Sequence, residues 1–272
     1  MRKRIVLGDM HGHIDSFKRI IAKEVPDDII MLGDYVDACS LGHKQIKKNV
    51  LELFDILDNY YDNEDHHNIC IVGNHDFHYM LGAWDEHYSG WNATTNFWAR
   101  TVLNERLRLG KMQWCYIDEK NRTIYSHAGV TMKWLKETCN NDWQPGGIDI
   151  ADINTLNMQY FRFDDSHGYD PYGDTPWNSP IWVRPMSLVE SMYKGSDGIT
   201  WTQVVGHTHM QRPLTPDNFL AQGLDRPLWI IDTLPDYYIV EMLDDDGMLL
   251  SREVANVTDA ADAEAAVMPP VI

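Results

Sequence analysis

The N-terminal half of the chain alternates short apolar runs with amphipathic segments. Three runs have the length of buried β-strands: Ile5–Leu7, Ile29–Leu32 and Ile69–Val72. An amphipathic segment through Phe17 separates the first two runs, and from His43 to Tyr60 the apolar residues fall three and four positions apart. This spacing predicts helices that pack by one face on a sheet. The order of strands and helices is typical of βαβ units.

The second half has a different pattern. A helical segment rich in Trp and Tyr extends from about Trp84 to Leu109, and the two runs in QWCYIDEKNRTIYS, joined by a polar turn, predict a hairpin. Residues 140–185 are dense in Gly, Pro, Asp, Asn and aromatic side chains, which predicts ordered loops with short helices. Four closely spaced strands follow, in TWTQVVGHTH, LWIIDT, YYIVEML and GMLLSREV, with DDDG as a hairpin turn. We therefore expect an antiparallel C-terminal half.

The pattern of predicted strands and helices indicates that the 272 residues form one domain. The contents of 44% hydrophobic and 24% charged residues are ordinary for a globular protein, and no internal repeat or linker divides the chain. We expect a single domain over residues 1–258, in which residues 140–185 are a loop-rich insertion near the functional site. Residues 259–272 are small and acidic and contain a Pro-Pro pair, which predicts a flexible tail.

Charge and cysteine content limit the possible partners. Lys and Arg number 23 and Asp and Glu number 41, so a formal net charge of −18 repels polyanions and disfavours nucleic acid. The four cysteines form no C-x-x-C pair and are not densely spaced, so the sequence suggests neither a zinc knuckle nor a disulfide framework: Cys39, Cys70, Cys115 and Cys139. The N-terminus has too few consecutive apolar residues for a signal peptide, and no run approaches the roughly 20 residues of a membrane span. We expect a cytoplasmic protein with no membrane partner.

Each of five predicted strands is followed by a metal-capable side chain with a glycine close by. The segments are IVLGDMH, IIMLGDYVD, ICIVGNHD, TIYSHAG and TQVVGHTH. Strands that share a direction end at the same edge of a sheet, and glycine permits a sharp turn there, so these side chains should converge. They offer oxygen and nitrogen donors and no thiolate, a set that suits Mn, Fe or Zn. The residues are Asp9, His11, Asp34, Asp37, Asn74, His75, Asp76, His127, His207 and His209.

Each segment alone also has a purely structural explanation, because Asp and His cap turns and a histidine can be a satisfied core residue. Asp76 and His78 in GNHDFHYM are expected to cap and position the following helix rather than bind metal. The Trp and Tyr residues of the stretch 143–182 either wall the pocket or form a small separate core. The presence of all five segments in one chain favours a metal site.

The ordered motifs GDMHG, GDYVD, GNHD, SHAG and GHT resemble those of the metallophosphoesterase superfamily. The resemblance is to its calcineurin-like, phosphoprotein phosphatase branch, which includes bacterial and phage members, and it extends from residue 8 to about residue 209. It implies an α/β fold in which a β-sandwich of mixed sheets is flanked by helices. The metals of the family lie at the C-terminal ends of the strands.

The resemblance also implies a role for each matching residue. Two divalent ions would be held by six side chains: Asp9 and His11 on the first, Asp34 bridging both, and Asn74, His127 and His207 on the second. His75 would be the catalytic acid, oriented by Asp37, and Arg184 in IWVRP would bind the substrate phosphate. We expect both ions to be Mn, with Fe or Zn as alternatives.

Two positions depart from the family pattern. The family has an arginine directly after the second aspartate of GDxVD, where this chain has Ala38, so one half of the phosphate clamp is absent. His43, Lys44 and Arg162 are candidate substitutes. GHTH contains a second histidine, His209, which the broader superfamily uses as a ligand of the first metal, and we predict the same role here.

The residues together predict a phosphatase that acts on phosphomonoesters. Two ions about 3.5 to 4 Å apart can hold a bridging hydroxide that attacks phosphorus, while an imidazole protonates the leaving oxygen. The expected substrate is a protein phosphorylated on Ser, Thr or Tyr, or a small phosphoester. His209 and the absent arginine support an alternative, a diadenosine tetraphosphatase-like nucleotide pyrophosphohydrolase or a phosphodiesterase. A non-catalytic module that binds phosphate or a partner is disfavoured by the complete ligand set.

Overall fold

The computed structural model describes residues 1–38, 40–60, 66–80, 90–139, 150–163, 174–221, 225–233 and 236–258. The strands in these residues are β1 (Arg2–Leu7), β2 (Asp28–Met31), β3 (His67–Cys70), β4 (Cys115–Asp118), β5 (Thr123–Ser126), β6 (Thr202–Val205), β7 (Leu228–Ile230), β8 (Tyr237–Leu243) and β9 (Leu249–Asn256). The α-helices are α1 (Ile14–Glu24), α2 (His43–Tyr60), α3 (Asn74–Met80), α4 (Ala93–Arg108), α5 (Met132–Cys139), α6 (Pro185–Glu190) and α7 (Pro216–Leu220). Two 3-10 helices are η1 (Ile150–Thr155) and η2 (Met158–Phe161).

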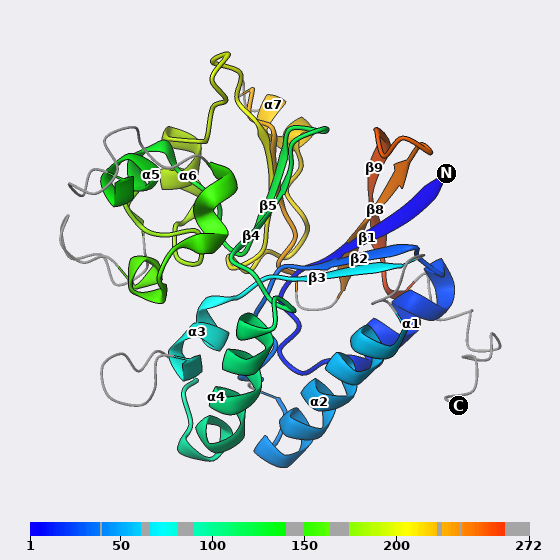
Figure 1. Ribbon diagram of the computed structural model, residues 1–272. Helices are drawn as coiled ribbons and strands as arrows, with labels where there is room; N and C mark the ends of the chain where they lie inside the picture. Colours follow the sequence, from blue (N-terminus) through cyan, green and yellow to red (C-terminus); the bar gives the residue numbers. More distant parts are fainter. Residues whose placement is uncertain are drawn as a thin grey trace.

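The strands form two mixed sheets (Figure 1). The five-stranded sheet has the order β3-β2-β1-β8-β9, in which β1, β2 and β3 are parallel and β8 is antiparallel to β1 and β9. The four-stranded sheet has the order β4-β5-β6-β7, in which β4 is antiparallel to β5 and the other pairs are parallel. The predicted α/β fold, a sandwich of mixed sheets flanked by helices, is confirmed.

Apolar side chains from both sheets pack against one another in the interior of the sandwich. This layer includes Val6 and Ile30 from the five-stranded sheet and Tyr125 and Val204 from the four-stranded sheet, all fully buried. The other face of the five-stranded sheet packs on α1 and α2 (Figure 1), through a larger cluster that includes Phe17. The strands β1 and β2 are therefore buried on both faces, which explains why the sequence shows them as continuous apolar runs.

A buried ionic cluster joins the two sheets. Glu241 of β8 is fully buried. Its carboxylate accepts hydrogen bonds from Arg252 Nε of β9 at 2.6 Å, from the Tyr125 hydroxyl of β5 at 2.8 Å and from Arg4 Nη1 of β1 at 3.3 Å. Arg4 Nη1 also donates to Asp118 of β4 at 3.2 Å. Because Tyr125 and Asp118 belong to the four-stranded sheet, the cluster fixes one sheet against the other.

The structure confirms several elements that the sequence predicts. The amphipathic segment from His43 to Tyr60 is α2, and QWCYIDEKNRTIYS forms the antiparallel pair of β4 and β5. The hairpin predicted at DDDG joins β8 to β9. The helix predicted between Trp84 and Leu109 is α4, which begins at Ala93, while residues 81–89 lie outside the described part of the chain.

The prediction of an antiparallel C-terminal half is wrong for two of its four strands. Strand β6 pairs in parallel with both β5 and β7, whereas β8 and β9 pair with antiparallel strands. Strand β7 also makes one isolated antiparallel bridge, between Ile230 and Leu214. The connection between β6 and β7 is long and contains α7, so the chain can return to the start of the sheet before the next strand. A parallel pair needs such a crossover, whereas a tight turn permits antiparallel pairing only.

Residues 150–163 and 174–185 of the segment 140–185 are described, and they contain short helices as predicted. Residues 150–163 form η1 and η2, and residues 140–149 and 164–173 lie outside the described residues. Phe161 stacks on Trp114 with ring centroids 3.9 Å apart, inside the main core. The rings of Trp182 and His207 are perpendicular, with centroids 6.0 Å apart. Phe161 therefore fills the core, and Trp182 borders the predicted site.

The domain boundary at residue 258 stays a prediction, because the tail at 259–272 lies outside the described residues, as does Cys39. None of the helices in the described part of the chain is long and apolar enough to cross a membrane.

Candidate functional site

The predicted metal ligands meet between the ends of the two sheets. Strands β1, β2 and β3 end at one edge, and the loops after them carry Asp9, Asp34 and Asn74. The parallel strands β5 and β6 of the other sheet are followed by His127 and His207. His127 Nε2 lies 3.5 Å from Asp34 Oδ2, and His127 Nδ1 lies 3.9 Å from Asp9 Oδ1. The two sheets therefore contribute complementary parts of one site.

The backbone turns sharply at several of these positions. The angle φ is +42° at His11, +52° at Asp34, +65° at Asp37 and +64° at His207. This left-handed conformation costs an L-residue about 1 to 3 kcal/mol, and it persists only where the surrounding contacts hold it. Of the six non-glycine residues with positive φ in the described residues, four belong to this site. Such a concentration is typical of functional sites.

Two glycines allow the carboxylates to lie against neighbouring backbone. A Cβ atom at Gly73 would lie 2.1 Å from Asp34 Oδ1, and one at Gly206 would lie 2.3 Å from Asp9 Oδ1. Asp34 Oδ1 in turn accepts the backbone N–H of His75 at 2.9 Å. A side chain at either glycine would displace a carboxylate, which explains why glycine precedes the polar residues in these segments.

Backbone carbonyls fix three of the histidines in one tautomer. One ring nitrogen of each lies at hydrogen-bond distance from a main-chain oxygen: His11 Nδ1 from Val36 at 2.8 Å, His127 Nδ1 from Leu32 at 2.8 Å, and His207 Nε2 from Trp182 at 3.1 Å. A carbonyl oxygen only accepts, so these nitrogens carry protons. Burial lowers the pKa of His127 and of His207, so both rings are neutral and their opposite nitrogens keep a lone pair. Metal-binding histidines are held in this way.

Three lone-pair atoms face one another at the junction of the two sheets. Asn74 Oδ1 lies 2.7 Å from His127 Nε2 and 2.9 Å from His207 Nδ1, and the two nitrogens are 3.2 Å apart. All three side chains are buried. His127 Nε2 and His207 Nδ1 carry no proton, and Asn74 presents its oxygen to them. These three atoms are all acceptors, so they cannot form hydrogen bonds with one another. A divalent cation would satisfy all of them, so this group fits the second metal position.

A second group lies around Asp34. Its Oδ2 atom is 3.8 Å from His11 Nε2 and 3.5 Å from His127 Nε2, so one oxygen faces both rings. Burial, together with the charges of Asp232 and Asp34, raises the pKa of Asp9 well above its ordinary value. Burial would also raise the pKa of Asp34, but the surrounding histidines lower it. Three carboxylates gathered in one buried place need a compensating cation, so these residues fit the first metal position.

We expect Mn²⁺ to stabilise the protein, because it would relieve repulsion among these carboxylates and the unfolded chain lacks the arrangement. At an ion concentration 100 times the dissociation constant, one site contributes about 2.7 kcal/mol. The Tm of chelator-treated protein should therefore rise by roughly 5 °C or more when Mn²⁺ is added, in a differential scanning fluorimetry experiment. NaCl at matched ionic strength is the control. A Tm that stays constant up to millimolar Mn²⁺ would contradict the assignment of the site.

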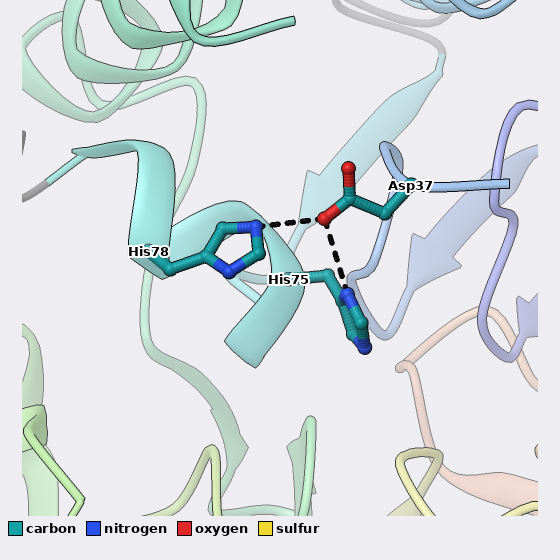
Figure 2. A group of neighbouring side chains, drawn as sticks. All are labelled: Asp37, His75 and His78. Atoms are coloured by element: carbon teal, nitrogen blue, oxygen red, sulfur yellow. Dashed lines mark hydrogen bonds and ion pairs between the residues drawn. The ribbon is translucent and has the colours of Figure 1, made fainter. Parts of the chain in front are cut away.

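Figure 2 shows the group around Asp37. His75 Nδ1 lies 3.2 Å from Asp37 Oδ2, and His78 Nε2 lies 2.7 Å from the same oxygen. The His75 ring also lies beside that of His11, with centroids 5.2 Å apart. Burial opposes protonation of His75, but the carboxylates of Asp34 and Asp37 raise its pKa to about 9. His75 therefore holds a proton at neutral pH next to the candidate metal ligands.

Arg184 and His209 lie at the edge of this arrangement. Arg184 is the N-cap residue of α6, and its Nη1 atom donates to the carbonyl of His207 at 3.1 Å and to Thr208 Oγ1 at 3.2 Å. The His209 side chain is 60% exposed, and its Nδ1 atom lies 3.9 Å from Asp232 Oδ1. Phosphate binding by Arg184 and metal ligation by His209 both stay predictions.

The position of the absent arginine has an apolar neighbourhood, since Ala38 packs against the main hydrophobic cluster. Among its candidate substitutes, His43 begins α2 and its Nδ1 atom lies 3.3 Å from Thr95 Oγ1. This contact ties the ring to α4 rather than to the proposed ligands. Lys44 and Arg162 are exposed.

The sequence does not indicate a functional role for two buried residues that lie at the site, Asp232 and His78. Asp232 follows β7, so it occupies the same position relative to its strand as the predicted ligands do. In LWIIDT an aspartate directly follows an apolar run, as in the predicted metal-site segments, but no glycine or histidine lies next to it. His78 was expected only to position a helix, and its contact with Asp37 depends on a loop distant in sequence.

Asp76 has the positioning role predicted for it, and its contacts extend beyond the helix. Its carboxylate accepts the N–H of Gly73 at 3.0 Å, within the turn that begins α3. The same carboxylate accepts the N–H groups of Asp34 at 2.9 Å and Tyr35 at 3.0 Å. Asp76 therefore fixes the loop that carries Asp34 against the start of α3 and is not directed at a cation.

Comparison with known proteins gives one family and a set of similar folds. The sequence model of the family described as calcineurin-like phosphoesterase matches residues 3–211. A serine/threonine phosphatase from Saccharomyces cerevisiae has a TM-score of 0.51 at 15% identity, over 100% of this chain and 82% of that chain, which supports the fold alone. A metallophosphoesterase from Sphaerobacter thermophilus has a TM-score of 0.47 at 13% identity, over 96% of this chain and 92% of that chain. No curated protein sequence matches the chain.

Proposed function

The chain belongs to the calcineurin-like phosphoesterase family, and we propose that it is a two-metal phosphomonoesterase of the phosphoprotein phosphatase branch, in the group that includes bacterial and phage enzymes. Family membership implies metal-dependent hydrolysis of phosphoesters. The observation that supports a phosphatase most directly is the position of His75, a protonated imidazole held by Asp37 beside a cluster of proton-free metal ligands. An acid and a cation site in this arrangement suit the transfer of a phosphoryl group to water.

The ligands divide between two cation positions. Two divalent ions bound there would activate a water molecule and polarise the phosphate oxygens. We propose that both are Mn²⁺, since the donors are carboxylate, amide and imidazole groups. The first position would use Asp9, His11 and Asp34, with His209 at its edge, and the second would use Asp34, Asn74, His127 and His207.

His75 supplies the proton that the leaving oxygen needs. Its Nδ1–H donates to Asp37, which leaves Nε2–H as the group that transfers a proton. Burial would raise the pKa of Asp37, but its hydrogen bonds from His75, His78 and Tyr79 lower it, so the carboxylate stays ionised. An ionised Asp37 both orients the imidazole and favours its protonated form.

The proposed substrate is a protein phosphorylated on Ser, Thr or Tyr, or a small phosphoester. Arg184 lies against the loop that carries His207, where its guanidinium would bind the phosphate oxygens. The net charge of −18 disfavours nucleic acid as a substrate. We propose that the protein acts in the cytoplasm, because the buried thiols of Cys70 and Cys115 are free and suit a reducing compartment.

A second candidate is a nucleotide pyrophosphohydrolase of the diadenosine tetraphosphatase type or a phosphodiesterase. Two observations favour it: the family's arginine after Asp37 is replaced by Ala38, and His209 lies beside Asp232 near the first cation position. Loss of an arginine that grips a terminal phosphate is less harmful to an enzyme whose substrate phosphate is esterified on both sides.

A substrate panel on Mn²⁺-loaded protein tests the proposal. We expect hydrolysis of p-nitrophenyl phosphate and of phosphopeptides to exceed that of bis-p-nitrophenyl phosphate and diadenosine tetraphosphate. Arg184→Ala should lower kcat/KM for the monoesters by about 10- to 100-fold, because a charge-assisted hydrogen bond contributes about 1.5 to 3 kcal/mol. Arg19→Ala on the exposed face of α1 is the matched control. Faster turnover of the diesters would favour the second candidate, and a folded, metal-loaded, inactive protein would contradict both.

A further inference from the structure

Asp37 has two side-chain partners besides His75. His78 Nε2 lies 2.7 Å from Asp37 Oδ2, the oxygen that also faces His75, and the Tyr79 hydroxyl donates to Asp37 Oδ1. The side chains of His78 and Asp37 are 0% and 2% exposed. Figure 2 shows both imidazoles directed at one carboxylate oxygen. In the chemistry described above, His78 and Tyr79 serve only to keep Asp37 ionised.

The direction of each hydrogen bond follows from its surroundings. A carboxylate only accepts, so His78 Nε2 carries the proton in its contact with Asp37. The backbone N–H of Asn92 donates to the Tyr79 oxygen at 3.0 Å. Of the two acceptors near this hydroxyl, the Asp37 carboxylate is closer than the Gly90 carbonyl at 3.4 Å, so the hydroxyl directs its own hydrogen toward Asp37. Burial also lowers the pKa of His78, so that it donates to Asp37 as a neutral ring.

Asp37 needs such support because its backbone is strained. It lies in the loop after β2 with φ of +65°, a conformation that relaxes unless other contacts hold it. His75, His78 and Tyr79 lie three and four positions apart on α3, so one face of one helix presents three donors to the carboxylate. His78 donates to Oδ2 of Asp37 and Tyr79 donates to Oδ1, and these two hydrogen bonds together fix the plane of the carboxylate. In this orientation Oδ2 also faces His75 Nδ1.

We propose that His78 and Tyr79 are positioning residues that hold Asp37, so that His75 keeps its proton on Nδ1 and presents Nε2–H to the leaving group. This inference rests on the proposed function. In the step that it serves, the bond from phosphorus to the leaving oxygen breaks as a water-derived oxygen bonds to phosphorus. The leaving oxygen takes the bond's electron pair and the proton from His75 Nε2. A misplaced acid is therefore most harmful where the leaving oxygen is most basic.

The test compares two esters in variants of the Mn²⁺-loaded protein. His78→Leu should lower kcat for phenyl phosphate by about 10- to 100-fold, the usual effect of removing a group that orients a reacting residue. For p-nitrophenyl phosphate, whose leaving phenol is acidic, kcat should fall by less than about threefold, with KM unchanged for both esters. His78→Gln, which keeps a side-chain N–H, should recover part of the loss. Equal losses on the two esters, with two ions bound per chain, would overturn the inference.

Tyr79→Phe provides a second variant that removes a single oxygen, in case His78→Leu does not fold. Tyr238→Phe is its matched control, because Tyr238 is equally buried and donates to Glu24 at 2.7 Å, away from the site. Tyr79→Phe should selectively reduce turnover of phenyl phosphate, whereas Tyr238→Phe should reduce neither ester.

If neither ester is hydrolysed, the proposed function is wrong. A spectroscopic measurement then still tests whether His78 and Tyr79 hold Asp37 against His75. Long-range ¹H–¹⁵N correlation on Zn²⁺-loaded protein with labelled histidine reports which ring nitrogen of His75 carries a proton. We expect the Nδ1 resonance of His75 to shift toward the value of an unprotonated or exchanging nitrogen in Tyr79→Phe and to stay in place in Tyr238→Phe. An unmoved resonance in Tyr79→Phe and in His78→Leu would overturn the inference.

Discussion

Replacing Asp34 with asparagine is expected to lower kcat/KM for p-nitrophenyl phosphate by about 1,000-fold or more, equivalent to about 4 kcal/mol of transition-state stabilisation. One carboxylate oxygen of Asp34 faces His11 at 3.8 Å and His127 at 3.5 Å, so it is placed to bridge two cations. The amide keeps the shape of the side chain and removes the negative charge between the ions. Asparagine also tolerates the left-handed backbone at this position, where φ is +52°.

Steady-state kinetics measures the loss of activity in this variant, and metal analysis measures how many ions it binds. The Asp34→Asn variant should bind fewer than two ions per chain and keep the circular dichroism spectrum of the parent protein. Asp55→Asn on the exposed side of α2 is the matched control and should change neither quantity. A variant that retains two ions and loses less than tenfold in activity would show that Asp34 does not bridge the cations.

Replacing Glu241 with glutamine is expected to lower the free energy of unfolding by about 3 kcal/mol or more, because it removes the carboxylate paired with buried Arg252 and one of the two carboxylates paired with buried Arg4. Glu241 is fully buried and accepts hydrogen bonds from Arg252, Tyr125 and Arg4. Urea denaturation should show a lower midpoint with an unchanged slope. Since the cluster does not touch the candidate metal ligands, kcat of the folded fraction should stay the same.

Glu253→Gln provides the control for this second substitution. Glu253 lies on β9, opposite Val240 of β8, but its side chain is exposed, so the same chemical change should cost less than about 0.5 kcal/mol. If Glu241→Gln and Glu253→Gln had equal effects on the midpoint, the buried cluster would not be what holds the two sheets together.

The sequence predicts well those features that depend on neighbours in the chain. The bounds of α2 follow from the spacing of its apolar residues, and the strands before the metal-capable segments follow from short apolar runs that end at polar residues. The direction of β6 and β7 was predicted wrongly because pairing depends on which strands lie side by side. Strand β6 lies next to β5, and the segment between them contains helices and long loops whose path cannot be derived from local pattern.

The candidate site shows the same division. The motifs place Asn74, His127 and His207 after strands, but only the structure brings their lone-pair atoms within 3.2 Å of one another. His78 gives no sequence signal for its contact with Asp37, because the partners are far apart in the chain and the contact depends on the face of α3 that meets the loop. Local patterns therefore identify the chemical groups, and tertiary packing decides which of them touch.

Strand β1 pairs with β8, so the first strand of the chain lies beside the second-last of the described strands in one sheet. A ribosome releases β1, β2 and β3 well before β8, and during that interval the edge of β1 has no partner. His127 and His207 also emerge after the loops that carry Asp9 and Asp34. We therefore expect the nascent chain to acquire its ions only after synthesis has passed His207.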